Sequence, residues 1–248
     1  MSDRPRPTKA ERREQARLER EAIQARLERR ARARRIGTAL VLVGVLVAVA
    51  AIVLLARGGG TAEVPAPQAL LQQADEAARA AACEEVRTTP PYGAQDRDHV
   101  ATLPDLATYP STPPASGPHG DFTLPAGVYD APPPLDQVLH SLEHGAAVVW
   151  YDPALANEEI DRIEAFFSQP VDRVAASQDR VIVAPYDYPG QAGRLPDGVG
   201  MALVAWHRIR LCGEPSLAAA FDFTSRFAFP TALDRPYEGE APEAGVPI

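Results

Sequence analysis

The sequence has 248 residues but contains one lysine and two cysteines, and it lacks the short motifs of several common enzyme classes. There is no G-x-S-x-G motif of a serine hydrolase, no glycine-rich loop that could cradle a phosphate, and no internal repeat. The preference for arginine over lysine is typical of a GC-rich bacterial genome. These absences indicate no particular reaction, so the sequence leaves open whether the protein is an enzyme.

Basic residues are scarce in most of the chain. Residues 1–35 contain 13 basic and six acidic residues, whereas residues 57–248 contain 12 basic and 27 acidic residues. Binding to nucleic acid phosphates needs a basic face. The acidic C-terminal part therefore argues against a nucleic acid partner.

Charge is absent from residues 36–56, a run of 21 residues that consists almost entirely of Val, Leu, Ile and Ala. A helix of this length spans about 30 Å, the thickness of a bilayer core. Residues 16–35 carry eight arginines and residues 57–76 carry one. The positive-inside rule then predicts a single-pass membrane protein with a cytoplasmic N-terminus and an extracytoplasmic C-terminal part. A cleaved signal peptide fits less well, because the segment before the apolar run is long and no small-x-small cleavage site follows it.

Changes in composition along the chain indicate where its parts begin and end. Gly58–Gln68 reads as a linker, and residues 234–248 are rich in Pro, Glu and Gly and poor in large apolar residues. The predicted parts are a cytoplasmic basic helix (1–35), a transmembrane helix (36–56), a linker or stalk (57–79), an exported domain (80–233) and a disordered tail (234–248).

Hydrophobic periodicity predicts an α+β fold for the exported domain. Repeated prolines make residues 89–134 an irregular segment that wraps over the core, which we call the Pro-rich wrap. We expect a small, mostly antiparallel sheet with helices on one face. The expected helices are 69–82, 135–144, a helix capped by Asn157, and one from Pro215 or Ser216 to Phe227; the expected strands are 146–151, 180–186 and 201–211.

Two histidines four residues apart, His140 and His144, lie in the segment HSLEHG at 140–145. Residues at this spacing share one face of a helix, so both imidazoles can reach one metal ion. We expect His119 of the Pro-rich wrap as a third ligand and His99 as a possible fourth. Imidazole donors without a nearby cysteine favour copper or zinc. The alternative is that the ring nitrogens bond to carbonyl groups of the wrap without a metal.

Three functions are compatible with this pattern. The first is a metal-binding exported module, and the second is a non-catalytic domain that binds a cell-envelope protein and uses the histidines to fix the wrap. The third is a peptidase, because HSLEH also fits the H-x-x-E-H pattern, in which Glu143 would be the catalytic base. The expected short helix and small domain weaken the peptidase hypothesis.

Several segments together resemble the bacterial domain of unknown function 3105. The similar segments are residues 109–119 (YPSTPPASGPH), 127–129 (GVY), 140–145 (HSLEHG) and 150–151 (WY), with Cys83 and residues 98–100 (DHV) as an opening motif. The resemblance covers about residues 80–212 and implies a membrane-anchored, exported protein without an established activity. Related sequences carry a cysteine before the GVY segment where this chain has Ala126, so a disulfide to that position cannot form here.

The two cysteines, Cys83 and Cys212, both lie in the part expected to be exported. Thiols in oxidising compartments tend to form disulfides, so we expect these two to pair. Two free buried thiols, or pairing between chains, are the alternatives.

Overall fold

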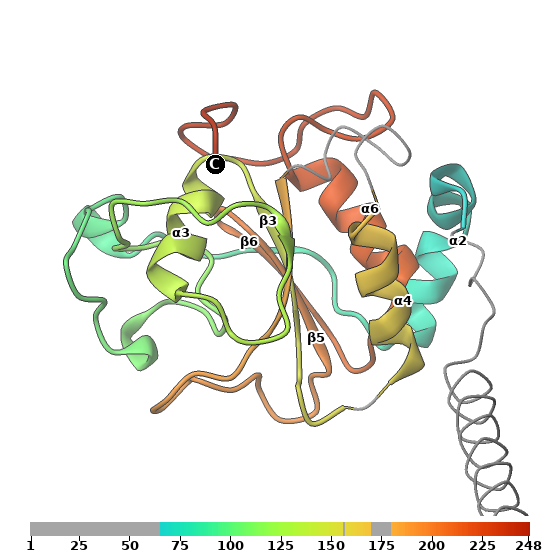
Figure 1. Cartoon of the computed structure of the whole chain (residues 1–248), viewed down its shortest axis with the longest axis horizontal. Coiled ribbons are helices and arrows are strands. Elements are labelled where there is room, and N and C mark those ends of the chain that lie inside the picture. The colour runs from blue at the N-terminus through green and yellow to red at the C-terminus, as the bar shows by residue number, and fades with distance from the viewer. Residues whose placement is uncertain (1–64, 156, 170–179) are drawn as a thin grey trace, which may run out of the picture. The chain divides into compact units, whose positions relative to one another are not determined.

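The computed structural model describes residues 65–155, 157–169 and 180–248. The predicted basic helix and membrane span, and the first part of the linker (57–64), therefore lie outside the described residues. Within the described ranges, no helix combines the length and the apolar character needed to cross a bilayer. The described chain is an α+β fold built on one mixed sheet (Figure 1).

The sheet contains six strands in the order β1-β6-β5-β3-β4-β2. The strands are β1 (Arg87–Thr88), β2 (Gly127–Val128), β3 (Ala147–Tyr151), β4 (Val181–Pro185), β5 (Met201–Ala205) and β6 (Arg208–Cys212). β3 pairs in parallel with β4, and β4 in parallel with β2, while the other three pairings are antiparallel. The expectation of a mostly antiparallel sheet is thus only partly right, because a helix between β3 and β4 brings the chain back in the same direction.

The central strands are buried on both faces. Val149, Val183 and Leu203 pack into one hydrophobic cluster, whereas Val148, Ile182 and Val204 pack into another on the opposite face. Because each face is apolar, each must be covered. Helices on one face alone, as we expected from the sequence, would leave the other face in water.

Within residues 65–155, 157–169 and 180–248, four α-helices and two short 3-10 helices surround the sheet. They are α2 (Pro67–Ala80), η1 (Gly93–Gln95), η2 (Leu106–Thr108), α3 (Leu135–Glu143), α4 (Glu158–Phe167) and α6 (Leu217–Phe227). α2, α4 and α6 lie on one side of the sheet, and α3 lies on the other with the Pro-rich wrap (Figure 1). The predicted cap of α4 is confirmed, since Asn157 accepts a bond from the Glu159 N–H. The last helix, expected to start at Pro215 or Ser216, starts at Leu217 with Ser216 as its N-cap, which accepts a bond from the Ala219 N–H.

The third predicted strand is two strands. Residues 201–211 were expected to be continuous, but Trp206 and His207 form a tight turn between β5 and β6. His207, the second residue of the turn, has a φ of +56°, whereas Trp206 has no positive φ, which is the pattern of a type II turn. Glycine or asparagine is the usual residue at that position, so the sequence carries no common turn signal at this point.

The folded part is longer at both ends than expected. α2 falls largely within the predicted linker, yet its Leu70 and Ala78 are buried in the core that α6 also lines. The tail 234–248 was predicted to be disordered, but it is hydrogen-bonded to the C-terminal end of α3. There the Glu243 N–H donates to the Glu143 carbonyl at 3.1 Å. Few large apolar residues are needed there, because the tail is held by backbone hydrogen bonds.

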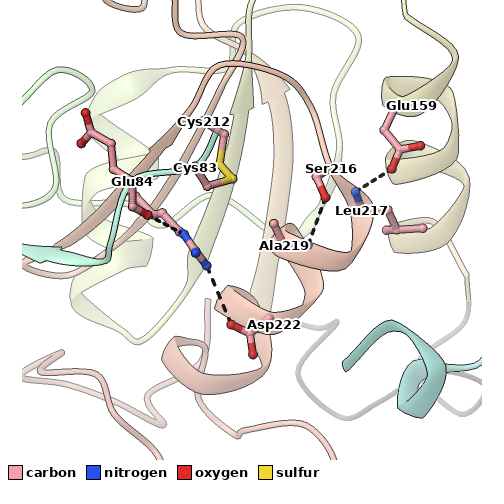
Figure 2. Close-up of a disulfide and its surroundings, with 9 residues drawn as sticks. Cys83, Glu84, Glu159, Cys212, Ser216, Leu217, Ala219 and Asp222 are labelled. Carbon is pink, nitrogen blue, oxygen red and sulfur yellow. Dashed lines mark hydrogen bonds and ion pairs between the residues drawn. A yellow bond between two sulfur atoms is a disulfide. The ribbon is translucent and has the colours of Figure 1, made fainter. Parts of the chain in front are cut away.

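A disulfide joins the two ends of this fold. Cys83, just after α2, is bonded to Cys212 at the end of β6, with an S–S distance of 2.08 Å (Figure 2). The described residues contain no free cysteine. Nearby, Arg210 donates to the Glu84 carbonyl, and the Leu217 N–H donates to Glu159, which ties α6 to α4.

Candidate metal centre

The helix α3 presents the central residues of the site. Leu135, Val138, Leu139 and Leu142 recur at helical spacing and are buried against the sheet. The remaining side of the helix carries His140 and Glu143 towards the Pro-rich wrap.

Gly145 ends the helix as predicted. Its φ is +93°, its N–H donates to the Leu142 carbonyl, and the Ala146 N–H donates to the Ser141 carbonyl. These two bonds form a Schellman motif, which favours glycine at this position. The motif fixes where α3 ends, and therefore where its C-cap residue His144 lies.

Two segments of the wrap bring the other histidines to the helix. The His119 N–H donates to the Asp98 carbonyl at 3.0 Å, and the Val100 N–H donates to the His119 carbonyl at 2.7 Å. This short parallel bridge places His99 beside His119. Residues that are 20 positions apart in sequence are thus held together by backbone hydrogen bonds.

His99, His119, His140 and Glu143 form a group in which one ligand atom of each lies within 4.8 Å of the others. The rings of the three histidines have centroid distances of 4.7 to 4.9 Å. His119, His140 and Glu143 are buried, whereas the His99 side chain is 46% exposed. The group can therefore hold a metal ion, with His99 on the solvent side.

Glu143 is a buried carboxylate whose two oxygens have different partners. Its Oε1 accepts a bond from Arg97 Nε at 2.6 Å, and its Oε2 lies 3.0 Å from His119 Nε2 and 4.0 Å from His99 Nε2. Burial by itself would raise the pKa of Glu143, but the His119 ring and the Arg97 guanidinium outweigh it and lower the pKa to about 2. The side chain is therefore an anion, as a metal ligand must be.

The hydrogen bonds of His119 indicate which of its ring nitrogens is bare, that is, carries no proton. Its Nδ1 lies 2.8 Å from the Gly117 carbonyl, which only accepts, so Nδ1 carries the proton. Nε2 is buried and has no hydrogen-bond partner, because its contact with Glu143 Oε2 is close but not aligned for a hydrogen bond. In neutral His119 a lone pair thus faces a carboxylate oxygen. A cation between them removes this repulsion.

His140 shows the same property. Its Nε2 lies 3.1 Å from Nε2 of His144, and its Nδ1 is buried without a hydrogen-bond partner. Burial and the neighbouring His119, His144 and His99 rings lower the pKa of His140, against a smaller opposing effect of the Gly120 backbone. The neutral imidazole that results is the form that binds metals.

His144 does not join the cluster, although the sequence placed it among the ligands. Its Nδ1 bonds to the Pro247 carbonyl at 2.8 Å, and its Nε2 faces His140. Glu143, considered from the sequence as a supporting or catalytic group and not as a ligand, takes its place in the group. In an H-x-x-E-H peptidase the glutamate stays available as a base, whereas Glu143 here is held by Arg97 and lies beside His119.

The loop that carries His119 is fixed from several sides. The Tyr109 hydroxyl donates to the Pro118 carbonyl at 2.7 Å, and the Ser116 hydroxyl donates to Asp96 at 2.7 Å. Asp96 also lies 2.8 Å from His207 Nε2, so the β5–β6 turn supports the loop. Sequence reasoning missed Arg97 and Asp96, because their partners are far along the chain and no local spacing links them.

A protein-family model described as "Protein of unknown function (DUF3105)" matches residues 99–242, which is more than half of the chain. The chain belongs to this family. The match confirms the resemblance seen in the sequence, and it includes all four residues of the cluster. Comparison with curated proteins and with solved structures gives no match. The DUF3105 description names no activity, so function must be argued from the site.

Proposed function

We propose that this DUF3105 protein binds one transition-metal ion through His99, His119, His140 and Glu143. The observation that carries the proposal is the pair of buried, bare nitrogens, His119 Nε2 and His140 Nδ1, beside an ionised carboxylate. Buried polar atoms are nearly always paired, so two such nitrogens in one cluster call for a common partner. A cation satisfies both nitrogens and the carboxylate together.

The donor set supports zinc or copper as the ion. Three imidazoles and one carboxylate, without thiolate or thioether, suit Zn²⁺ and Cu²⁺. A tetrahedral ion with ligands at about 2.0–2.1 Å holds them roughly 3.4 Å apart. The four ligand atoms lie within 4.8 Å of one another, so binding requires small movements of the side chains. The half-exposed His99 is the ligand with the most freedom to make this movement.

The proposal includes an exported, membrane-anchored location. The apolar run at 36–56 and the arginine asymmetry across it support a single-pass anchor with the metal-binding domain outside the cytoplasm. The intramolecular disulfide agrees with an oxidising compartment.

Metal content of the purified full-length chain tests the proposal. Elemental analysis should find about one zinc or copper ion per chain, and His119→Ala and His140→Ala should each lower this content to near zero. Glu143→Gln should weaken binding by roughly 10- to 100-fold or more, because the neutral amide is a poor ligand.

The fifth histidine offers a matched control. His207 lies outside the cluster and contacts Asp96 through Nε2, a bond that the amide of His207→Gln can replace. This variant should keep the wild-type metal content. Equal metal content in wild type, His119→Ala and His140→Ala would refute the proposed site.

A further inference from the structure

We infer that the C-terminal segment 243–247 is a positioning element of the metal site, acting on His140 through His144. The inference rests on the proposed metal binding and extends it to residues that are not ligands. It begins with the contacts between this segment and the end of α3. There the N–H groups of Glu243 and Gly245 donate to the carbonyls of Glu143 and His144, at 3.1 and 3.4 Å. The segment thus satisfies carbonyls that the end of a helix leaves without partners.

A buried arginine and a glycine hold the segment in place. Arg180 donates to both the His144 carbonyl and the Val246 carbonyl, at 3.2 and 2.6 Å, and so bridges helix and tail. At Gly145 an added Cβ would lie 3.1 Å from Phe229 Cβ and 3.4 Å from Ala244 Cα. Gly145 therefore allows the close approach of the tail as well as ending the helix. Figure 1 shows the C-terminus at this end of α3.

The tail determines which nitrogen of His144 carries its proton. The Pro247 carbonyl, 2.8 Å from Nδ1, can only accept, so Nδ1 is protonated. In neutral His144 the other nitrogen, Nε2, is then an acceptor. It lies 3.1 Å from His140 Nε2, which must be the donor of that bond.

The same chain of bonds fixes the proton of His140. With Nε2 protonated, Nδ1 is the bare nitrogen, and this is the buried atom that has no hydrogen-bond partner. A carbonyl in the tail thus selects, through His144, the form of His140 whose Nδ1 carries no proton and is free to bind an ion. Metal-bound histidines commonly depend on such an outer partner for ring orientation and tautomer.

Glu243 adds a second link between tail and site. Its Oε1 accepts from Arg97 Nη2 at 3.0 Å, and Arg97 in turn holds Glu143. Its Oε2 lies 3.3 Å from His144 Nε2 but is not hydrogen-bonded to it, so Nε2 remains the acceptor from His140. The tail therefore contacts Arg97 and His144, the residues that hold Glu143 and His140, which are the two ligands that α3 contributes.

Two substitutions of His144 in the full-length chain separate its two bonds. The amide of Asn can replace Nδ1 and keep the bond to Pro247, whereas the longer side chain of Gln places its oxygen near the position of Nε2 and can still accept from His140. His144→Gln should therefore keep zinc affinity within a few-fold of wild type. His144→Asn, and a chain ending at Pro242, should lose about 10- to 100-fold. The inference would be overturned if His144→Gln and His144→Asn lost zinc affinity equally, or if His144→Asn and the truncated chain lost none.

Nitrogen NMR of the metal-free chain measures which ring nitrogen of each histidine carries the proton. A merely structural role of the tail would leave these protonation sites unchanged. The chain has five histidines, so ¹⁵N signals can be assigned by single substitutions. Wild type should show His140 protonated at Nε2 and His144 at Nδ1, and the truncated chain should lose the fixed Nδ1 proton of His144. The reverse tautomers in wild type would contradict the inference. Because this measurement uses no metal, it still decides the inference if wild type binds no zinc, a result that would instead refute the proposed function.

Discussion

The carboxylate of Glu143 is oriented before any ion binds. One oxygen is held by Arg97, so the other is directed towards His119 and His99. A ligand that is already fixed loses little conformational freedom when the metal binds. The same arginine is half-exposed, so it can move when His99 and the metal approach.

The pH dependence of metal binding should reflect histidine and not glutamate. Protons compete with the ion for imidazole nitrogens, and an unperturbed imidazole takes up its proton near pH 6.5. The lowered pKa of His140 keeps this ligand neutral somewhat below that pH, and a pKa of about 2 keeps Glu143 ionised. We expect zinc affinity to be constant above about pH 7 and to fall as the pH decreases below about 6.5, without a further step near pH 4–5. Affinity measured by competition with a chromophoric chelator tests this, and an affinity that rises on acidification would contradict it.

At the scale of elements, the conformation of the loop before His119 depends on one glycine. Gly117 has a φ of +126°, and a Cβ there would lie 2.6 Å from Cε1 of Tyr109, whose hydroxyl anchors the loop. Gly117→Ala should lower stability by about 1–3 kcal/mol. It should also weaken zinc binding, because the displaced ring of Tyr109 and the strained backbone move His119.

A second glycine gives the control for this substitution. Gly190 has a φ of +91°, and a Cβ at that position would meet nothing within 4 Å. Gly190→Ala should cost stability through backbone strain alone and leave zinc affinity unchanged. Thermal unfolding and zinc titration of both variants separate the two effects. If Gly117→Ala binds zinc like wild type, the glycine is not needed to place His119.

The elements that the sequence predicted well are those with local signals. α3, α4 and α6 were found from hydrophobic spacing together with a cap or a terminal glycine, and these signals act within a few residues. The β5–β6 turn was missed, because Trp206 and His207 are not common turn residues. The Pro-rich wrap was expected over the core, but the helix α3 was not expected on the second face of the sheet, although the continuous apolar run at 146–150 requires burial on both faces.

The candidate site was predicted in part for the same reason. The helical spacing identified His140, and the rigid, proline-containing loop identified His119. Spacing alone also suggested His144, because it shows that two residues share a helix face without showing where each ring points. The tail decided that point through Pro247, which is 103 residues away in sequence. Such a contact leaves no mark on the local pattern.

At the scale of the whole molecule, the disulfide closes almost the entire domain. Cys83 and Cys212 are separated by 129 residues, and the chain-entropy model assigns a loop of this length roughly 4–5 kcal/mol of stabilisation. The double variant Cys83→Ser/Cys212→Ser should lose stability on that order in urea unfolding. Thiol labelling of wild type under denaturing, non-reducing conditions should find no reactive thiol. Two reactive thiols per chain would show that the bond does not form.

The proposed orientation of the chain in a membrane rests on the eight-to-one arginine asymmetry around residues 36–56. Arginine-rich flanks stay in the cytoplasm, so the proposed metal site should face the outside of the cell membrane. Protease added to intact spheroplasts should remove a tag at the C-terminus and spare one at the N-terminus. The tags must be joined by flexible linkers, because residues 243–247 are bonded to the end of α3 and a tag fused directly to them would be shielded. A cytoplasmic reporter protein, intact in the same sample, controls for lysis. A C-terminal tag that survives until the membrane is dissolved would reverse the topology, and the metal site would then lie in the reducing cytoplasm, where the disulfide is not expected to persist.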